Sequence, residues 1–379
     1  MSRSPSSAAS AGITPLPATR GWSTRLVSGG GSATATDASS AEADAPSRRD
    51  GVRLTVVVTT YERPGYLRQS LASIAAQSAK GCFRVVVQDN ASTADYSAVI
   101  AEYAEGLDLE YVRNETNLGA AGNIEAALTR YRDTEYLTVF HDDDLMHPRM
   151  LEWQLQLMDS DPSIMFTATQ CAAFEDGTTP PAELWQDVAT PACMIFDDAV
   201  GLVRGILSSF ELAFSSVMYR TSVLDRVRLD FERFNLYCDR PYLVEIARLG
   251  KSALVTAPLV LYRIHAAQDT NSGALTVPIM IELMKYYRES LGADASVEDR
   301  ELFLKRSTSF VAQAYTTLPR AGRPSPVQFL FRTRAAGVLR LRDISKEHWF
   351  ALLEGTAGYW LVRLGVRVKQ AARRVFGSA

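Results

Sequence analysis

Three consecutive carboxylates, Asp142, Asp143 and Asp144, are the residues of this sequence best placed to do chemistry. They directly follow residues 136–140, an apolar run with the length of a buried strand. Three carboxylates at one strand end repel one another unless a cation neutralises them. Oxygen ligands favour Mg²⁺ or Mn²⁺, which in proteins commonly also contact substrate phosphates. The run therefore predicts a metal site, and the alternative is a solvated acidic turn.

Two more polar clusters end apolar runs of the same kind. Residues 59–65 (TTYERPG) follow the run 54–58, and residues 88–92 (QDNAS) follow the run 83–87. In sheets of parallel strands, ligands bind just beyond the carboxyl ends of the strands. We therefore expect all three polar clusters to surround one binding site.

Helical patterns separate these apolar runs. Pro64 suits the first turn of a helix, further helices are predicted near residues 96–105, 123–131 and 148–161, and another strand is predicted at 109–112. This alternation predicts an α/β fold with a mostly parallel sheet and helices on both faces. Neither GxGxxG after the first strand nor GxxxxGK[ST] is present, which argues against a dinucleotide dehydrogenase and a P-loop enzyme.

Composition narrows the class of protein. The chain has 379 residues, 47% of them hydrophobic, which suits one large domain or two ordinary ones. Its net charge of −3 provides no basic field for nucleic acid. No apolar run reaches the ~18 residues of a membrane-spanning helix. The four cysteines are far apart and form no CxxC pair, which is typical of reduced thiols in a cytoplasmic protein.

The two ends of the chain differ from this average. Ser, Ala, Thr, Gly and Pro make up 35 of the first 47 residues, so residues 1–50 are expected to be disordered, with a transit peptide as the less favoured alternative. Residues 332–379 carry ten Lys or Arg against three Asp or Glu. Apolar side chains recur with helical spacing along residues 360–375. This pattern suits an amphipathic helix on an anionic membrane surface and, equally, a helix packed on the protein's own core.

Seven short motifs, in order between residues 52 and 272, resemble those of family 2 glycosyltransferases. Four resemble motifs of that family's nucleotide-binding half: TTYERP (59–64), VVVQDNAS (85–92), RNETNLGAAGN (113–123) and FHDDDLMHP (140–148). Three resemble its acceptor half: SSVMYRTSVL (215–224), CDRPYLVEIARLG (238–250) and LYRIHAAQDT (261–270). Each motif is weak by itself, and the order of all seven makes the resemblance specific.

The resemblance implies a fold and a division of the chain. It implies the GT-A fold, the nucleotide-diphospho-sugar transferase fold, over residues 51–275, with a nucleotide half at 51–150 and an acceptor half at 151–275. A helical extension over 276–331 and the basic tail 332–379 are expected to follow.

The resemblance also implies a reaction. The donor would be a nucleotide-diphosphate sugar, UDP-linked or similar, used together with Mn²⁺ or Mg²⁺. The acceptor would be a glycan, a lipid-linked molecule or a small molecule. We expect the protein in the cytoplasm, with attachment to the cytoplasmic face of a membrane as the alternative that the basic tail leaves open.

Single residues receive roles from the same resemblance. The family's nucleotide-binding positions correspond here to Thr59, Tyr61, Glu62, Asp89, Gly119 and Asp142. Its metal-binding positions correspond to Asp143, Asp144 and His265, and its catalytic base corresponds to Asp239. The tyrosine would stack on the base, and the catalytic carboxylate would take the proton of the attacking hydroxyl with inversion at the anomeric carbon. Without the resemblance, Asp239 would be interpreted as a surface carboxylate, His265 as a histidine that hydrogen-bonds a loop, and Gly119 as a glycine required by a turn.

The sequence departs from the family pattern at three positions. His141 stands where many relatives have the first aspartate of the acidic motif, Cys238 where a glutamate is common, and Glu62 where an asparagine is frequent. The QxxRW motif of processive polysaccharide synthases is absent, so we expect one sugar to be transferred in each encounter.

Two other classes of function remain open at this point. One is a binding protein that kept the fold and lost catalysis, which predicts a damaged metal or base position. The other is a sugar-1-phosphate nucleotidyltransferase, a class that usually carries a Gly-rich loop after its first strand. Asp143 and Asp239 are both present, and TTYERP is not a Gly-rich loop, so transfer remains the favoured hypothesis.

Overall fold

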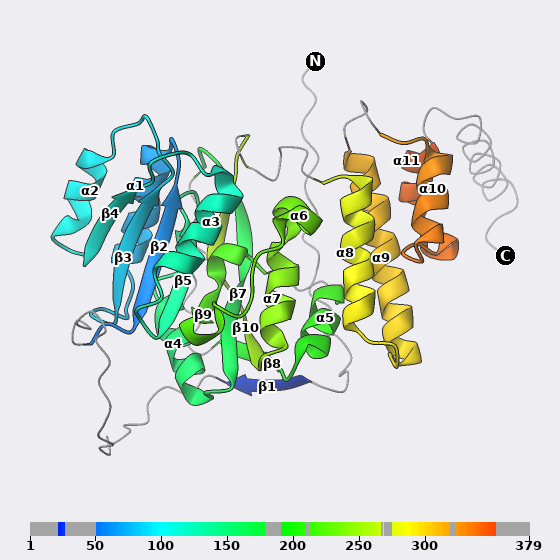
Figure 1. Ribbon diagram of the computed structural model, residues 1–379, viewed down its shortest axis with the longest axis horizontal. Coiled ribbons are helices and arrows are strands. Elements are labelled where there is room, and N and C mark those ends of the chain that lie inside the picture. Colours follow the sequence, from blue (N-terminus) through cyan, green and yellow to red (C-terminus); the bar gives the residue numbers. More distant parts are fainter. Residues whose placement is uncertain are drawn as a thin grey trace, which may run out of the picture.

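One mixed sheet runs through the centre of the molecule (Figure 1). The computed structural model describes residues 22–26, 51–178, 191–208, 212–266, 268, 275–318 and 323–353. Within those residues, ten strands pair in the order β1-β8-β10-β7-β9-β5-β2-β3-β4, and β6 pairs with β10. Helices flank the sheet and extend beyond one end of it (Figure 1).

The nucleotide half of the sheet contains a block of four parallel strands, as the sequence predicts. Its strands are β2 (Leu54–Thr60), β3 (Phe83–Asp89), β4 (Leu109–Arg113) and β5 (Tyr136–His141). Parallel pairs join β5 to β2, β2 to β3 and β3 to β4. Every residue of β2 is buried, because helices cover both faces of this strand. The carboxyl ends of β2, β3 and β5 therefore meet at one edge of the sheet.

Antiparallel pairs involve the remaining strands. β6 (Leu145–Met146), at the end of the nucleotide half, pairs antiparallel with β10. The strands of the acceptor half are β7 (Ile164–Glu175), β8 (Ala192–Phe196), β9 (Met218–Arg220) and β10 (Lys251–Ile264). The short strand β9 pairs antiparallel with both β5 and β7 and so joins the two halves into one sheet. β10 runs parallel to β7 but antiparallel to β8. The α/β fold class is confirmed, with the parallel pairing concentrated in the nucleotide half.

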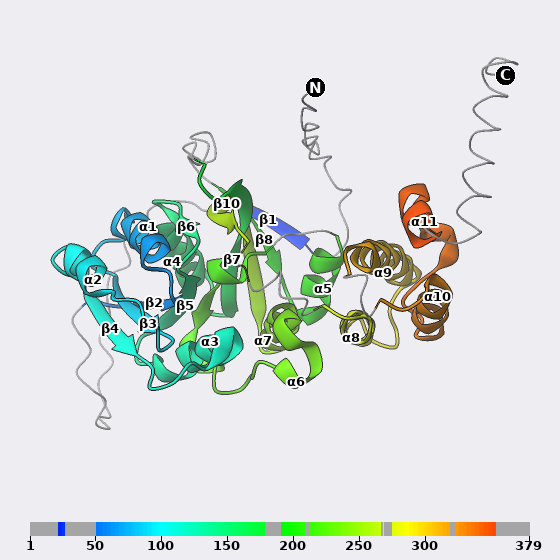
Figure 2. The ribbon, with the colours of Figure 1, turned by 90° about the horizontal axis from the view of Figure 1, so that it is seen from above.

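Helices pack on both faces of the sheet (Figure 2). α1 (Pro64–Ala75) and α4 (Met150–Ser160) cover one face, with α2 (Ser97–Ala104) beside β4. On the opposite face lie α3 (Gly119–Arg130) and α7 (Asp239–Ala247), with α5 (Ala199–Leu207) and the short α6 (Phe231–Phe234) beside them. Two apolar cores result, one on each face, and both rest on the β-branched residues of β2 and β3.

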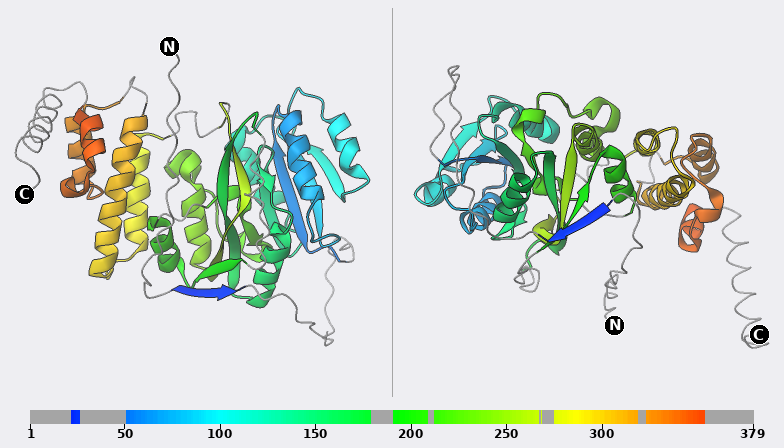
Figure 3. Two further views of the ribbon diagram at one scale, coloured as in Figure 1. Left: turned by 180° about the vertical axis from the view of Figure 1, so that it is seen from behind. Right: turned by 90° about the horizontal axis from the view of Figure 1, so that it is seen from below.

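Four further helices extend the second core beyond α5 (Figures 1 and 3). They are α8 (Val277–Ser290), α9 (Val297–Thr317), α10 (Pro326–Ala335) and α11 (Lys346–Leu353). Ser325 and Gln328 form a capping box at the start of α10. This helix continues to Ala335, so the expected division between residues 331 and 332 falls inside it and is not a boundary of the structure.

The chain ends fit their expectations only in part. β1 (Trp22–Leu26) lies within the segment expected to be disordered and pairs antiparallel with β8 (Figure 3). Backbone pairing with an exposed sheet edge needs no apolar composition, which explains why composition did not indicate this strand. The expected basic helix over residues 360–375 lies outside the described residues. None of the helices in the described ranges combines the length and the apolar character needed to span a bilayer.

Candidate functional site

The carboxyl ends of β2, β3 and β5 enclose a cavity of about 300 Å³, which we call the strand-end cavity. Its lining comes from the segment after β2, the segment after β3, the acidic run after β5 and the start of α3. Tyr61 lines it and is 44% exposed, whereas Thr59 is nearly buried and its hydroxyl donates to the carbonyl of Phe140 over 3.4 Å. The aromatic ring of Tyr61 is therefore accessible to a planar ligand, and Thr59 forms part of the wall.

Asp142 and Asp143 both line the strand-end cavity, and the Arg63 guanidinium lies close to both carboxylates. Asp142 is buried, accepts a hydrogen bond from the Thr60 hydroxyl over 2.6 Å and lies 3.5 Å from the Arg63 guanidinium. The Asp143 carboxylate pairs with the same guanidinium over 3.0 Å and with His265 Nε2 over 2.9 Å. The two carboxylates predicted to face the donor therefore lie side by side at the sheet edge.

Asp144 points away from this cavity into the protein. It is buried, and its carboxylate accepts from the Ser215 hydroxyl over 2.6 Å and from the Arg263 backbone N–H over 3.3 Å. Even so, one potential ligand atom from each of His141, Asp143 and Asp144 lies within 4.8 Å of the others. The acidic run and the histidine before it can therefore hold a divalent ion between one nitrogen and two oxygen donors.

Electrostatics in this run favour a bound cation. Burial, followed by the negative charge of Asp143, raises the pKa of Asp142 to about 7. The same two causes, in the same order, raise the pKa of Asp144 to about 8. A divalent ion would favour the ionised form of each carboxylate and offset the cost of burying it.

His265 and His141 hold different places from those the sequence indicates. His265 contacts Asp143 and packs against the Tyr66 ring, with 5.1 Å between ring centroids, so it orients an acidic residue. His141, the last residue of β5, joins the two aspartates in the potential ligand set. The family pattern marks His141 only as a missing aspartate, whereas its position directly before the acidic run is the sequence signal for a ligand.

Asp89 and Glu62 are engaged by other protein groups, and neither lines the strand-end cavity. Asp89 is fully buried and accepts from Ser92 and from the Tyr111 hydroxyl over 2.8 Å, with the Arg113 guanidinium 3.4 Å away. Glu62 has a left-handed backbone, with φ of 56°, and its carboxylate accepts the N–H groups of the segment 93–94. These bonds lower the pKa of Glu62 and shape the loop behind Tyr61.

Gly119 starts α3 at the rim of the same cavity. Its φ of 71° is left-handed, and an added Cβ there would meet no atom within 4 Å. The glycine is therefore required by the turn, not by a close approach of another segment. Asn90 fixes this turn through its side-chain N–H groups, which donate to Asn117 Oδ1 and to the carbonyl of Gly119.

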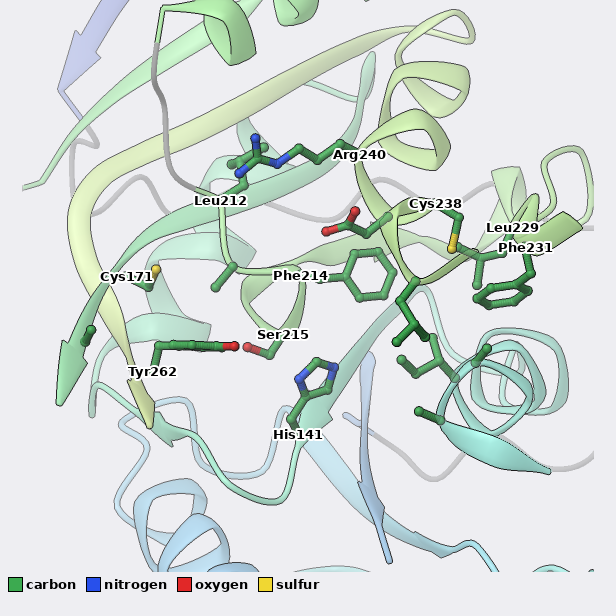
Figure 4. A pocket seen from close by; sticks show the side chains of 17 residues that line it. His141, Cys171, Leu212, Phe214, Ser215, Leu229, Phe231, Cys238, Arg240 and Tyr262 are labelled. Carbon is green, nitrogen blue, oxygen red and sulfur yellow. The ribbon is translucent and has the colours of Figure 1, made fainter. Parts of the chain in front are cut away.

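A second cavity of about 470 Å³, the α7 cavity, adjoins the first and shares His141, Ala120 and Ile124 with it. In Figure 4, His141 and Arg240 lie at opposite ends, Leu229 and Phe231 lie on one side, and Tyr262 lies on the other. The wall is mostly apolar, and Asp239 is the one carboxylate among its lining residues. A molecule bound in the α7 cavity would thus contact one carboxylate, that of Asp239, and would lie beside the strand-end cavity.

Asp239 is the first residue of α7 and is partly buried. Burial raises its pKa above the ordinary range, and the positive charge of Arg240 opposes this shift. The neighbouring Cys238 is buried, and burial raises the pKa of its thiol to about 12, so this cysteine stays protonated. A carboxyl group whose pKa is moved toward neutrality, inside a cavity, has the properties of a general base.

Comparison with known proteins relates this chain to one enzyme family. Residues 55–222 match the family Glycosyl transferase family 2. This region of the chain belongs to the family 2 glycosyltransferases. The match includes the strand-end cavity and the acidic run, and Asp239 lies beyond it.

Several curated proteins share parts of this glycosyltransferase. Over 83 residues, 21% of the chain, it is 37% identical to a hyaluronan synthase of Pasteurella multocida, of which the alignment covers 8%. Over 102 residues, 27% of the chain, it is 28% identical to the poly(ribitol-phosphate) beta-N-acetylglucosaminyltransferase TarS of Staphylococcus aureus, of which 18% is covered. An uncharacterised protein of Mycobacterium tuberculosis is 25% identical over 56% of the chain and 59% of its own length. The chain thus spans less than two thirds of each of these relatives.

Solved structures confirm the GT-A type of fold. A structure of S. aureus TarS 1–349 with UDP-GlcNAc has a TM-score of 0.56 and 18% sequence identity, and covers 84% of this chain and 92% of that one. The UDP complex of the same protein has a TM-score of 0.55 and 17% identity over the same shares.

Proposed function

We propose that this glycosyltransferase moves one sugar from a nucleotide-diphosphate donor to an acceptor hydroxyl, with inversion and with the help of a divalent cation. The observation that carries the proposal is the meeting of two cavities at His141. One presents the accessible ring of Tyr61 and the acidic run, and the other presents Asp239. A donor that spans this junction would have its nucleotide on one side and its anomeric carbon facing the base.

In this proposal the donor nucleotide occupies the strand-end cavity. The base stacks on Tyr61, Thr59 forms the wall beside it and Asp142 bonds the ribose. Asp89, Glu62 and Gly119 act through the loops that they hold, since their polar groups are engaged by other protein groups. A uridine diphosphate donor is the first choice, since TarS structures of the same fold contain UDP and UDP-GlcNAc.

The residues at the sheet edge fit a divalent cation. His141, Asp143 and Asp144 would hold it, and the two carboxylates supply the oxygen ligands that Mn²⁺ and Mg²⁺ prefer. An imidazole ligand suits Mn²⁺ better than Mg²⁺, which favours oxygen. When bound, such an ion neutralises charge on the departing diphosphate. His265 keeps Asp143 oriented from behind, in the way that outer partners of metal ligands do.

Asp239 acts as the base on the acceptor side. It accepts the proton of the attacking hydroxyl while that oxygen bonds to the anomeric carbon and the diphosphate leaves from the opposite face. Attack opposite the leaving group inverts the configuration in one step. The mostly apolar wall of the α7 cavity excludes water, which would otherwise compete with the acceptor. Residues 51–275 form the catalytic unit in this proposal.

A screen of nucleotide sugars for metal-dependent hydrolysis tests the proposal. We expect release of a nucleoside diphosphate from at least one donor with Mn²⁺ present, and loss of that release on adding a chelator. A binding protein without catalysis would bind a donor and leave it intact. A nucleotidyltransferase would instead form nucleotide sugar from a nucleoside triphosphate and a sugar 1-phosphate, and that result would refute transfer.

A further inference from the structure

A third cavity, of about 240 Å³, lies between α5, α8 and α9, and we call it the helix cavity. Arg240 lines both this cavity and the α7 cavity, so the two cavities share one basic residue. Arg306 of α9 lines the helix cavity as well, together with Ser309 and Gln313. With Tyr287, which also lines it, the helix cavity therefore has two cations and three neutral side chains that can form hydrogen bonds.

Neither of the two arginines forms an ion pair with a carboxylate of the described residues, whereas Arg204 does. Arg204 of α5 makes a bidentate pair with Asp299 of α9, at 2.7 and 2.8 Å. Arg306 follows Asp299 two helical turns further along α9, yet no ion pair of the described residues includes it or Arg240. Both guanidinium groups belong to half-buried residues. The charge of Arg240 interacts with that of Asp239 beside it, so Arg306 is the arginine of this pair without a described counterion. A partly buried charge without a counterion is costly, unless a ligand supplies the counterion.

The chemistry of the helix cavity identifies the class of ligand. No carboxylate lines it, so a cationic ligand finds no partner there. Arginine presents a rigid fork of N–H donors that matches phosphate oxygens. Asp239 lines the α7 cavity, and the residue after it, Arg240, lines both that cavity and the helix cavity. A molecule held there by its anion can place a hydroxyl at the base.

We propose that the acceptor of this glycosyltransferase carries a phosphate-type anion that binds Arg240 and Arg306 in the helix cavity while its hydroxyl lies at Asp239. This inference rests on the proposed function, because it names the acceptor's chemical class. Phosphate of this kind occurs on amphipathic lipids and on soluble polyols. The apolar wall of the α7 cavity, with Leu229 and Phe231, suits the first source, and the anion site suits both.

Calorimetry on the full chain without nucleotide sugar tests the anion site. The probes are octyl phosphate below its micelle concentration and glycerol 3-phosphate, with octanol and glycerol as neutral controls. We expect at least one phosphate probe to bind at least about tenfold more tightly than its neutral control, since hydrogen bonds to charged groups are the strong ones. If only octyl phosphate binds, the acceptor is of the lipid type. If glycerol 3-phosphate binds, the acceptor class includes phosphates of soluble polyols. If neither phosphate probe binds better than its control, the proposal is wrong.

Variants locate the binding. Arg306→Gln should weaken binding of the phosphate probe about tenfold, and Arg306→Lys should weaken it less, because the charge stays and the fork is lost. Arg332→Gln, which changes an exposed arginine on α10, should bind like the wild type. Wild-type affinity in Arg306→Gln contradicts the proposal, and Arg306→Lys gives the same test if the glutamine variant does not fold. Since no donor is present, this result is independent of donor hydrolysis, which tests the proposed function.

Discussion

The strand-end cavity and the α7 cavity share His141, but their walls come from different kinds of residue. The strand-end cavity is lined by polar side chains that follow parallel strands and are fixed by a dense set of hydrogen bonds, such as Asn90 with Asn117. The α7 cavity has a mostly apolar wall drawn from distant segments, with Asp239 as its one carboxylate. A charged nucleotide needs fixed polar partners, whereas an acceptor needs space, dryness and one base. The difference predicts that changes in the first cavity alter donor affinity and changes at Asp239 alter rate.

The largest effect is expected at the base. Asp239→Asn keeps the shape of the side chain and removes its basicity, so transfer should slow by roughly 10²–10⁴-fold. Donor affinity should change little, because the proposed position of the nucleotide is the strand-end cavity. Steady-state transfer rates and calorimetric donor binding measure the two quantities separately.

Glu245 provides the matched control for this variant. It lies on the same helix, but its carboxylate is engaged by the Tyr286 hydroxyl over 2.7 Å and by Arg248. Glu245→Gln should transfer sugar at the wild-type rate. A wild-type rate in Asp239→Asn would show that Asp239 is not the base. It would also contradict the assignment of donor binding to one cavity and proton transfer to the other.

The next effect concerns the metal. Asp143→Ala should lower the affinity for UDP in the presence of Mn²⁺ by at least roughly 10–100-fold, the range observed when a metal site loses only a group that supports a ligand. Without metal, the variant and the wild type should bind alike. Asp133→Ala removes an exposed carboxylate that pairs with Arg84 and should leave the metal-dependent affinity unchanged. Equal UDP affinity in Asp143→Ala and wild type, with Mn²⁺ present, would contradict the metal assignment.

A third prediction uses the burial of the base. Burial raises the pKa of Asp239, and a base works only when ionised, so the rate should fall as pH falls through that raised value. The acid limb of kcat/KM should lie above the value of about 4 expected for an exposed aspartate. It should decline about tenfold for each further pH unit and be absent from the residual rate of Asp239→Asn. A profile that stays flat down to pH 4 would mean that Asp239 is not the titrating base.

The smallest effects on affinity are expected for residues of the donor site, where a residue that contacts the donor can be compared with one that only stabilises a loop. Tyr61→Ala should weaken UDP binding roughly tenfold, because stacking of a base on an aromatic ring is worth about 1–3 kcal/mol. Glu62→Ala should change the affinity by less than about threefold, because its bonds to residues 93–94 lie at an exposed site. Affinity measurements on both variants decide, and an equal loss would show that the loop itself carries the binding.

The strand-end cavity could be predicted from sequence because its parts are local. Each polar cluster directly follows an apolar strand, so the positions of Tyr61 and Asp143 followed from chain order and parallel pairing. The surroundings of Asp89 could not be predicted, because its partners Tyr111 and Arg113 reach it from the neighbouring strand β4.

The α7 cavity could be predicted only at one residue. Asp239 was found through a motif, whereas Ser215, Leu229 and Tyr262 meet there only after β9 and β10 join the sheet. The sequence also could not show that His141 belongs to the potential ligand set and His265 does not. Both histidines lie near Asp143, and only side-chain direction decides which one orients a carboxylate and which one joins the set.

A crystal structure of the protein with Mn²⁺ and a non-hydrolysable UDP-sugar tests the central claim most directly. The account predicts the uracil ring on Tyr61, the diphosphate at Asp143 and the anomeric carbon beside His141, with its open face toward Asp239. Mn²⁺ should contact ligand atoms of the acidic run. A sugar that points away from the α7 cavity, or a nucleotide bound outside the strand-end cavity, would contradict the account.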